Sequence, residues 1–143
     1  MGADSYLAFD FGLARIGVAG GERITASAHA LTTLAAQQGA PDWAAVEALI
    51  EEWRPAALIV GVPRHTDGSD SESTRAAERF ARRLAGRFAL PVHTVDEALS
   101  SHEAGERLAA TGRPVRHRRD KSRLDAVSAA VILETWFSEQ GLR

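Results

Sequence analysis

Acidic residues at three places in the sequence could hold a divalent cation. Asp10 stands at the end of an apolar run, Asp96 and Glu97 follow the apolar run Pro91–Val95, and Asp125 enters a run of small apolar residues. Ligand sites of open α/β sheets gather beyond the carboxyl ends of strands. Clustered carboxylates suit Mg²⁺, and two such ions about 4 Å apart can stabilise the attacking and leaving oxygens of a phosphodiester. The pattern therefore favours metal-assisted phosphodiester chemistry.

Each of these acids also has an ordinary structural interpretation. Asp10 could accept hydrogen bonds from backbone amides in the turn that follows it. Asp96 and Glu97 could be loop acids, and the stretch from Ser122 to Asp125 fits a helix capping box. Function is favoured for Asp125 because the helix after it is apolar on nearly every face, and a carboxylate that enters a core needs a partner.

A basic segment, residues 113–123 (RPVRHRRDKSR), precedes Asp125. It carries six Lys or Arg residues and one Asp, a local charge of +5, whereas the rest of the chain has a net charge of −7. Such a block on an acidic body suggests a localised contact with a polyanion, although a solvated loop would have the same composition. The candidate nucleic-acid contacts in it are Arg116, Arg118, Arg119, Lys121 and Arg123.

The composition describes one soluble domain, residues 1–143. Of its residues, 45% are apolar and 25% are charged, which is enough for a core and unlike a disordered chain. The absence of cysteine excludes disulfides and thiolate metal sites. We expect a cytoplasmic protein without a membrane span, because the N-terminus does not resemble a signal peptide and no apolar run approaches about 20 residues.

The elements that must position these acids alternate in type. A three-stranded meander followed by strand–helix units predicts a mixed α/β sheet with helices on both faces. The predicted strands are residues 5–11, 15–20, 24–34, 57–60 and 91–95, with a loop at 37–41. The predicted helices are 42–53, 71–88, one from Ser100 or Ser101 to about Ala110, and a last one from about Leu124 to Phe137, after the basic loop.

Four motifs of the sequence resemble those of the YqgF/RuvX family. They are DFGLARIGVA (10–19), VGVPRHTDG (60–68), VDEALSS (95–101) and KSRLDAVSAAVIL (121–133). The resemblance implies an RNase H-like fold with a five-stranded mixed sheet in the order 3-2-1-4-5. It also implies that Asp10, Glu97 and Asp125 form a catalytic triad that binds Mg²⁺ or Mn²⁺. One departure is Ala98, where the family usually has arginine.

Two further places in the sequence can be interpreted beside the resemblance. Arg64 and His65 lie just beyond the strand 57–60, near the expected site, and Arg64 is a candidate nucleic-acid contact, although both could equally be solvated. Gly17 lets a neighbouring element pack closely against the second strand.

The expected function is that of a metal-dependent nuclease (a hydrolase) acting on structured RNA. Its expected role is maturation of the 5′ end of pre-16S rRNA in ribosome biogenesis, with precursor rRNA and ribosomal particles as partners. Three alternatives remain at this point. The chain could cut branched DNA as a Holliday-junction-resolvase-like endonuclease, or bind RNA without cutting it as a ribosome-assembly factor. An ATPase or sugar kinase would need a second lobe, for which 143 residues leave no room.

Overall fold

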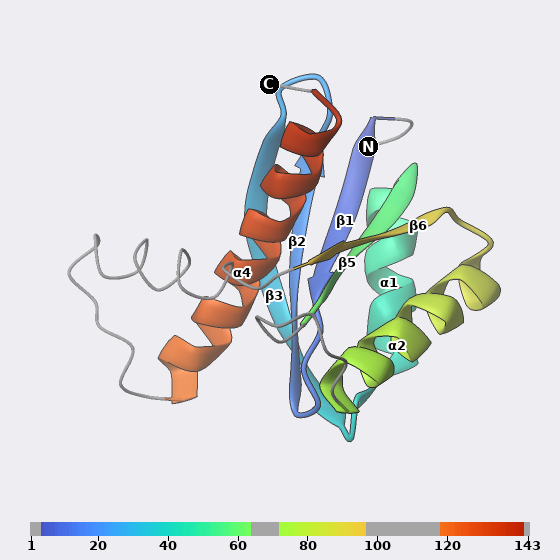
Figure 1. The fold of residues 1–143 in the computed structure, drawn as a ribbon, viewed down its shortest axis with the longest axis vertical. Helices are drawn as coiled ribbons and strands as arrows, with labels where there is room; N and C mark the ends of the chain where they lie inside the picture. Colours follow the sequence, from blue (N-terminus) through green and yellow to red (C-terminus); the bar gives the residue numbers. More distant parts are fainter. Residues whose placement is uncertain (1–3, 64–71, 97–117, 142–143) are drawn as a thin grey trace.

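The computed structural model describes residues 4–63, 72–96 and 118–141, which form a mixed sheet with helices on both faces (Figure 1). The six strands follow the order β4-β3-β2-β1-β5-β6. The strands are β1 (Ser5–Asp10), β2 (Arg15–Glu22), β3 (Ser27–Gln37), β4 (Ala40–Pro41), β5 (Ala57–Val62) and β6 (Val92–Asp96). The helices are α1 (Trp43–Trp53), α2 (Glu72–Phe88) and α4 (Arg118–Glu139).

The central strand is β1, and its direction sets the position of the site. It pairs antiparallel with β2 and parallel with β5, and β5 pairs parallel with β6. The carboxyl ends of β1, β5 and β6 therefore meet at one edge of the sheet. Every residue of β1 and of β5 is buried, as the continuous apolar run at 57–60 predicts for a strand covered on both faces.

Two layers of helix cover the sheet. Helices α1 and α2 pack on the face that carries Leu7 and Phe9 of β1, and α4 packs on the face that carries Tyr6 and Ala8 (Figure 1). Alternate residues of a strand point to opposite faces, which explains why β1 contributes to both cores. Helices on both faces and the predicted strand order are confirmed. The sixth strand, β4, is an addition of two residues beyond β3.

Several predicted boundaries were wrong in the third strand and the loop after it. The chain turns at residues 23–26, where the Ala26 amide donates to the Arg23 carbonyl and Ala26 has a φ of 50°. Ile24 therefore lies in a turn, 79% exposed, and β3 begins at Ser27. The predicted loop at 37–41 contains the end of β3 and all of β4, joined by a turn at Gly39 with a φ of 85°. Strands β2, β5 and β6 each extend one or two residues beyond the predicted ends.

The start of the last helix was also predicted wrongly. Helix α4 begins at Arg118, so residues 118–123 are helical and are not part of a basic loop. The helix therefore runs through Ser122, and the predicted capping box at Ser122–Asp125 does not form. Arg and Lys are strong helix formers, so a charged segment extends a buried helix outward although it lacks the apolar periodicity used to locate it. The predicted helix near 100–110 and residues 113–117 lie outside the described residues.

The described helices do not include one that is both long enough and apolar enough to cross a membrane.

Candidate active site

Asp10 occupies the last position of β1, at the edge where three parallel strands end. It lies on the same face as Tyr6 and Ala8, because strand residues two apart share a face, and that face is covered by α4. Its partners in the sheet are Gly17 on β2 and Gly61 on β5. Neither neighbour has a side chain, and the space over Gly17 is taken by the main chain of α4. Asp10 itself is buried.

Asp125 reaches this region through a close contact between α4 and β2. A β-carbon on Gly17 would overlap the main-chain carbonyl of Asp125 and would lie 2.8 Å from the Ala126 nitrogen. Gly17 is paired with Asp10, and paired residues of antiparallel strands have Cα atoms about 4.5–5.5 Å apart. The backbones of Asp10 and Asp125 are therefore within about 10 Å of each other. The prediction that a neighbouring element packs on Gly17 is confirmed.

Arg15 holds the Asp125 side chain. The Arg15 Nε donates a hydrogen bond to Asp125 Oδ2 at 2.7 Å, within an ion pair. The Arg15 side chain is 38% exposed and that of Asp125 is 21% exposed, so the pair lies at the mouth of the site and not in the core. Its effect is to orient one carboxylate oxygen and to place a positive charge beside the candidate metal ligands.

A buried hydroxyl lies one helical turn beyond Asp125. Ser128 Oγ is fully buried and lacks a hydrogen-bond partner in the part of the chain that the structure describes. Residues three or four apart share a helix face, so Ser128 lies on the same side of α4 as Asp125 and Ile132. Ile132 packs in the core with Tyr6 and Ala8. Ser128 therefore faces the β1 side of the interface.

The direction of α4 sets the level of this hydroxyl along β1. The helix contacts the sheet near Gly17 through Asp125 and near Gly21 through Leu133. Gly17 pairs with Asp10 of β1, and Gly21 pairs with Tyr6. Helix α4 thus runs from the Asp10 end of β1 toward its beginning. Ser128, between these two contacts, lies between the levels of Asp10 and Ala8, because the next residue, Ala129, packs with Ala19, the partner of Ala8.

These donors fit a hard divalent cation. Two carboxylates and a hydroxyl offer the oxygen ligands that Mg²⁺ and Mn²⁺ prefer, and buried polar groups without partners are the exception in folded proteins. Residues 4–63, 72–96 and 118–141 contain no cluster of three or more His, Asp or Glu suited to a metal. The third member of the predicted triad, Glu97, lies outside the described residues.

The neighbouring acid, Asp96, can be assigned to a face of the sheet. Val95 packs in the core beneath α4, and Asp96 is the next residue of β6. Since successive strand residues point to opposite faces, Asp96 points away from the α4 face that carries Asp10. This arrangement is unfavourable for Asp96 as a ligand shared with Asp10.

The predicted nucleic-acid contacts are described only in part. Arg118, Arg119, Lys121 and Arg123 belong to the first two turns of α4, which lead directly to Asp125. Arg64 and Arg116 lie outside the described residues.

Arg15 was not predicted from the sequence as a site residue. Its position offered a signal, because residues two apart in a strand share a face and Gly17 was expected to contact another element. Arg15 therefore had to lie on the same side of β2 as that element. A charged residue at this place was the available clue to the pair with Asp125.

The chain is similar to known proteins over nearly its whole length. Residues 4–139 match the model of the RuvX family, described as Holliday junction resolvase. A protein of Azotobacter vinelandii named "Putative pre-16S rRNA nuclease" is 53% identical over 135 residues, which are 94% of this chain and 93% of that one. A protein of Pseudomonas putida with the same name is 53% identical over 131 residues, covering 91% and 92%.

Solved structures with a similar fold are more distant in sequence. RuvC of Thermus thermophilus in complex with a Holliday junction substrate superposes with a TM-score of 0.55 at 15% identity, covering 96% of each chain. Another structure of Thermus thermophilus RuvC gives a TM-score of 0.51 at 14% identity, covering 96% of this chain and 97% of that one. At these identities the likeness concerns the fold, and it agrees with the RNase H-like sheet expected from the sequence.

Proposed function

The chain belongs to the RuvX family, and from this premise we propose that it is a nuclease that hydrolyses phosphodiester bonds with a divalent metal ion. The observation that supports this most directly is that Asp10 and Asp125 lie at the same height along the strands of the sheet. These two acids lie 115 positions apart in the sequence, yet the contact at Gly17 brings their backbones together at the carboxyl edge of the sheet.

The residues that would hold the metal are Asp10, Glu97 and Asp125. When bound, Mg²⁺ or Mn²⁺ would stabilise the negative charge that develops on a phosphodiester and would lower the pKa of a water molecule. Asp10 is fixed by its place in a strand buried on both faces, and Asp125 by the Arg15 hydrogen bond and the Gly17 contact. Such rigid support keeps carboxylates close together despite their mutual repulsion.

We propose structured RNA as the substrate, namely the 5′ end of pre-16S rRNA in ribosome biogenesis. The name shared by the relatives at 53% identity supports this choice. So does the basic segment 113–123, because phosphate neutralisation by Lys and Arg supplies most of the sequence-independent affinity for nucleic acids. Precursor ribosomal particles in the cytoplasm are the setting that this substrate implies.

A second candidate substrate is a four-way DNA junction. The family description and the fold shared with RuvC favour it. Resolution of a junction requires two symmetric cuts, which normally need a two-fold dimer. A junction-cutting enzyme would therefore be a dimer on its substrate, whereas trimming of an RNA end needs a single active site.

The two substrates are distinguished by a direct comparison. We expect the purified protein with Mg²⁺ or Mn²⁺ to cut a precursor RNA that spans the 5′ end of 16S rRNA, and EDTA to prevent it. Faster cutting of a four-way junction than of this RNA would favour resolution as the function. Tight RNA binding without metal-dependent cutting of either substrate would show a non-catalytic assembly factor and contradict the proposal.

A further inference from the structure

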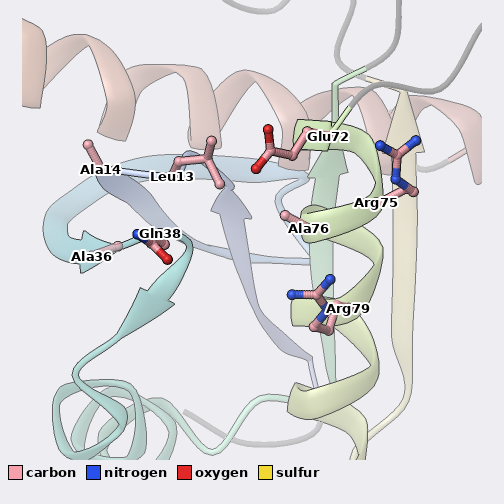
Figure 2. Close-up of a pocket in the computed structure, with 8 residues that line it drawn as sticks. All are labelled: Leu13, Ala14, Ala36, Gln38, Glu72, Arg75, Ala76 and Arg79. Atoms are coloured by element: carbon pink, nitrogen blue, oxygen red, sulfur yellow. The ribbon is translucent and has the colours of Figure 1, made fainter.

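A pocket lies on the other side of the β1–β2 turn from the α4 face. It has a volume of about 550 Å³ and opens between this turn, the end of β3 and helix α2 (Figure 2). Its lining residues are Leu13, Ala14, Ala36, Gln38, Glu72, Arg75, Ala76 and Arg79. The apolar residues come from the β1–β2 turn, from the end of β3 and from Ala76, whereas the charged residues all come from α2.

We propose that Arg75 and Arg79 of this pocket bind a backbone phosphate of the nucleic acid. The phosphate would belong to the strand that is cut, a few nucleotides from the bond in the active site. The inference rests on the proposed nuclease function and extends it to a second contact, independent of the basic segment 113–123. Arginine guanidinium groups match phosphate oxygens with paired, charge-assisted hydrogen bonds. Arg75 and Arg79 are one helical turn apart and exposed, and their side chains extend in different directions (Figure 2). A single phosphate would therefore draw the two guanidinium groups together.

The walls of the pocket are fixed by packing and hydrogen bonds. The Ala36 amide donates to the Ala14 carbonyl at 2.9 Å, and the Gly39 amide donates to the Leu13 carbonyl at 2.8 Å. These bonds join the β1–β2 turn to the end of β3 and to the β3–β4 turn. On the other side, the Thr74 hydroxyl donates to the Pro63 carbonyl and ties the first turn of α2 to the end of β5.

The aromatic core below holds both sides of the pocket in place. Phe80 of α2 contacts the rings of Phe11 and Trp43, with centroids 5.4 Å and 5.8 Å away. Phe11 follows directly after β1, and Trp43 begins α1. The backbone walls of the pocket are therefore a preformed part of the fold, and its charged groups are exposed side chains of α2.

Charge distinguishes α2 from the neighbouring helix on the same face. Helix α2 contains five arginines and two glutamates, a net charge of +3, whereas α1 contains three glutamates and no basic residue. A polyanion that approaches this face is attracted to α2 and repelled by α1. Glu72 is the acidic member of the pocket, and its carboxylate extends toward Leu13 (Figure 2). The two arginines outweigh it.

The distance to the candidate active site suits one continuous strand. Leu13 is three residues after Asp10, so their Cα atoms are at most about 11 Å apart. Successive phosphates of a helical strand advance by about 3.4 Å along the axis. A strand with one phosphate at the pocket would therefore pass over the β1–β2 turn and reach the carboxylates within a few nucleotides.

The test compares two pairs of substitutions on α2 that remove the same charge. The double variant Arg75→Ala/Arg79→Ala empties the pocket of its cations. The control, Arg82→Ala/Arg83→Ala, removes two exposed arginines of the same helix that do not line the pocket. Binding of a labelled RNA that spans the 5′ end of 16S rRNA is measured by fluorescence anisotropy in EDTA, over a range of salt concentrations.

We expect the pocket variant to bind this RNA roughly tenfold more weakly, as loss of hydrogen bonds to a charged group predicts. The slope of log K against log salt should fall by about 0.7–0.9 for the lost phosphate contact, and the control should change affinity by less than about threefold. Glu72→Gln should strengthen binding. Equal losses in the two double variants would show general attraction to a basic helix and would overturn the pocket assignment.

This outcome is separable from that of the proposed function, because binding in EDTA does not depend on catalysis. A wild-type protein that never cuts would contradict the nuclease proposal while the binding comparison still tests the pocket. A wild-type protein that cuts, with both double variants binding equally, would contradict the pocket alone. If inorganic phosphate displaced the RNA from the pocket at a concentration equal to that of the RNA, the pocket would bind a small phosphate compound. That result would overturn the proposal that it binds a nucleic-acid strand.

Discussion

The main chain of Asp125 lies directly on Gly17, with no room between them for a single carbon atom. This contact joins the last helix to the strand beside β1 at the level of Asp10. The contact therefore determines whether Asp10 and Asp125, the two candidate ligands that the structure describes, belong to one site. The residue that carries no side chain is as important to this geometry as the two that carry carboxylates.

Gly17→Ala should displace the start of α4 from the sheet. A methyl group would overlap the Asp125 carbonyl, so we expect a loss of about 3 kcal/mol in the free energy of unfolding, with loss of cleavage. Gly86→Ala is the control, because a β-carbon there meets nothing within 4 Å and alanine favours the helix. Urea titration of both variants measures the difference, and equal stabilities would show that α4 adjusts without cost.

Arg15→Gln should strengthen the binding of Mg²⁺ or Mn²⁺. The guanidinium occupies Asp125 Oδ2 and places a positive charge beside the ligands, so its removal should lower the metal concentration at half-saturation about fivefold. Arg23→Gln removes the same charge from an exposed turn and should leave this value unchanged. Metal titrations followed by melting temperature measure both, and a higher half-saturation in Arg15→Gln would mean that Arg15 chiefly orients Asp125 for the metal.

Ser128→Ala should separate stability from metal binding. Without metal, we expect the free energy of unfolding to rise by about 1 kcal/mol, because a buried hydroxyl without a partner is removed. With Mg²⁺, the increase in melting temperature should be smaller than in wild type. Ser138→Ala, on the exposed face of the same helix, controls for helix propensity and should leave the metal effect intact. An undiminished metal effect in Ser128→Ala would remove the hydroxyl from the site.

Replacing Arg116, Arg118 and Arg119 with alanine should reduce the dependence of RNA binding on salt. Two or three lost phosphate contacts predict a slope of log K against log salt that is lower by about two units. The fold should persist because alanine is a strong helix former at the start of α4. The same change at Arg23, Arg82 and Arg83 is the matched control. Parallel salt titrations for wild type and the first triple variant would show that the basic segment is merely solvated.

The sheet could be predicted from the sequence because its signals are local. Continuous apolar runs marked β1 and β5, and short links between the first three strands allowed only a meander. The start of α4 could not be placed, since a charged helical extension lacks an apolar stripe. The turn at residues 23–26 was hidden by Ile24, an apolar residue that the structure leaves exposed.

The acids of the candidate site can be proposed from the sequence, whereas the contacts of those acids cannot. Asp10 and Asp125 stand out because carboxylates are costly in apolar surroundings. Their relative position depends on the contact between α4 and Gly17, a long-range event that no local pattern encodes. The same holds for the Arg15–Asp125 pair, which joins residues 110 positions apart, and for a pocket made from two turns and a helix.

The most direct test of the account is the rate at which Asp10→Asn cuts precursor 16S rRNA with Mg²⁺, compared with wild type and Asp96→Asn. We expect Asp10→Asn to lose at least about a hundredfold in rate. Loss of a residue that binds the metal should cost more than loss of a residue that only supports such a ligand, which typically costs about 10–100-fold. Asp96→Asn, whose side chain points away from the α4 face, should retain cutting near the wild-type rate. Wild-type cutting by Asp10→Asn would show that the acid at the end of β1 is structural and would contradict the proposed metal site.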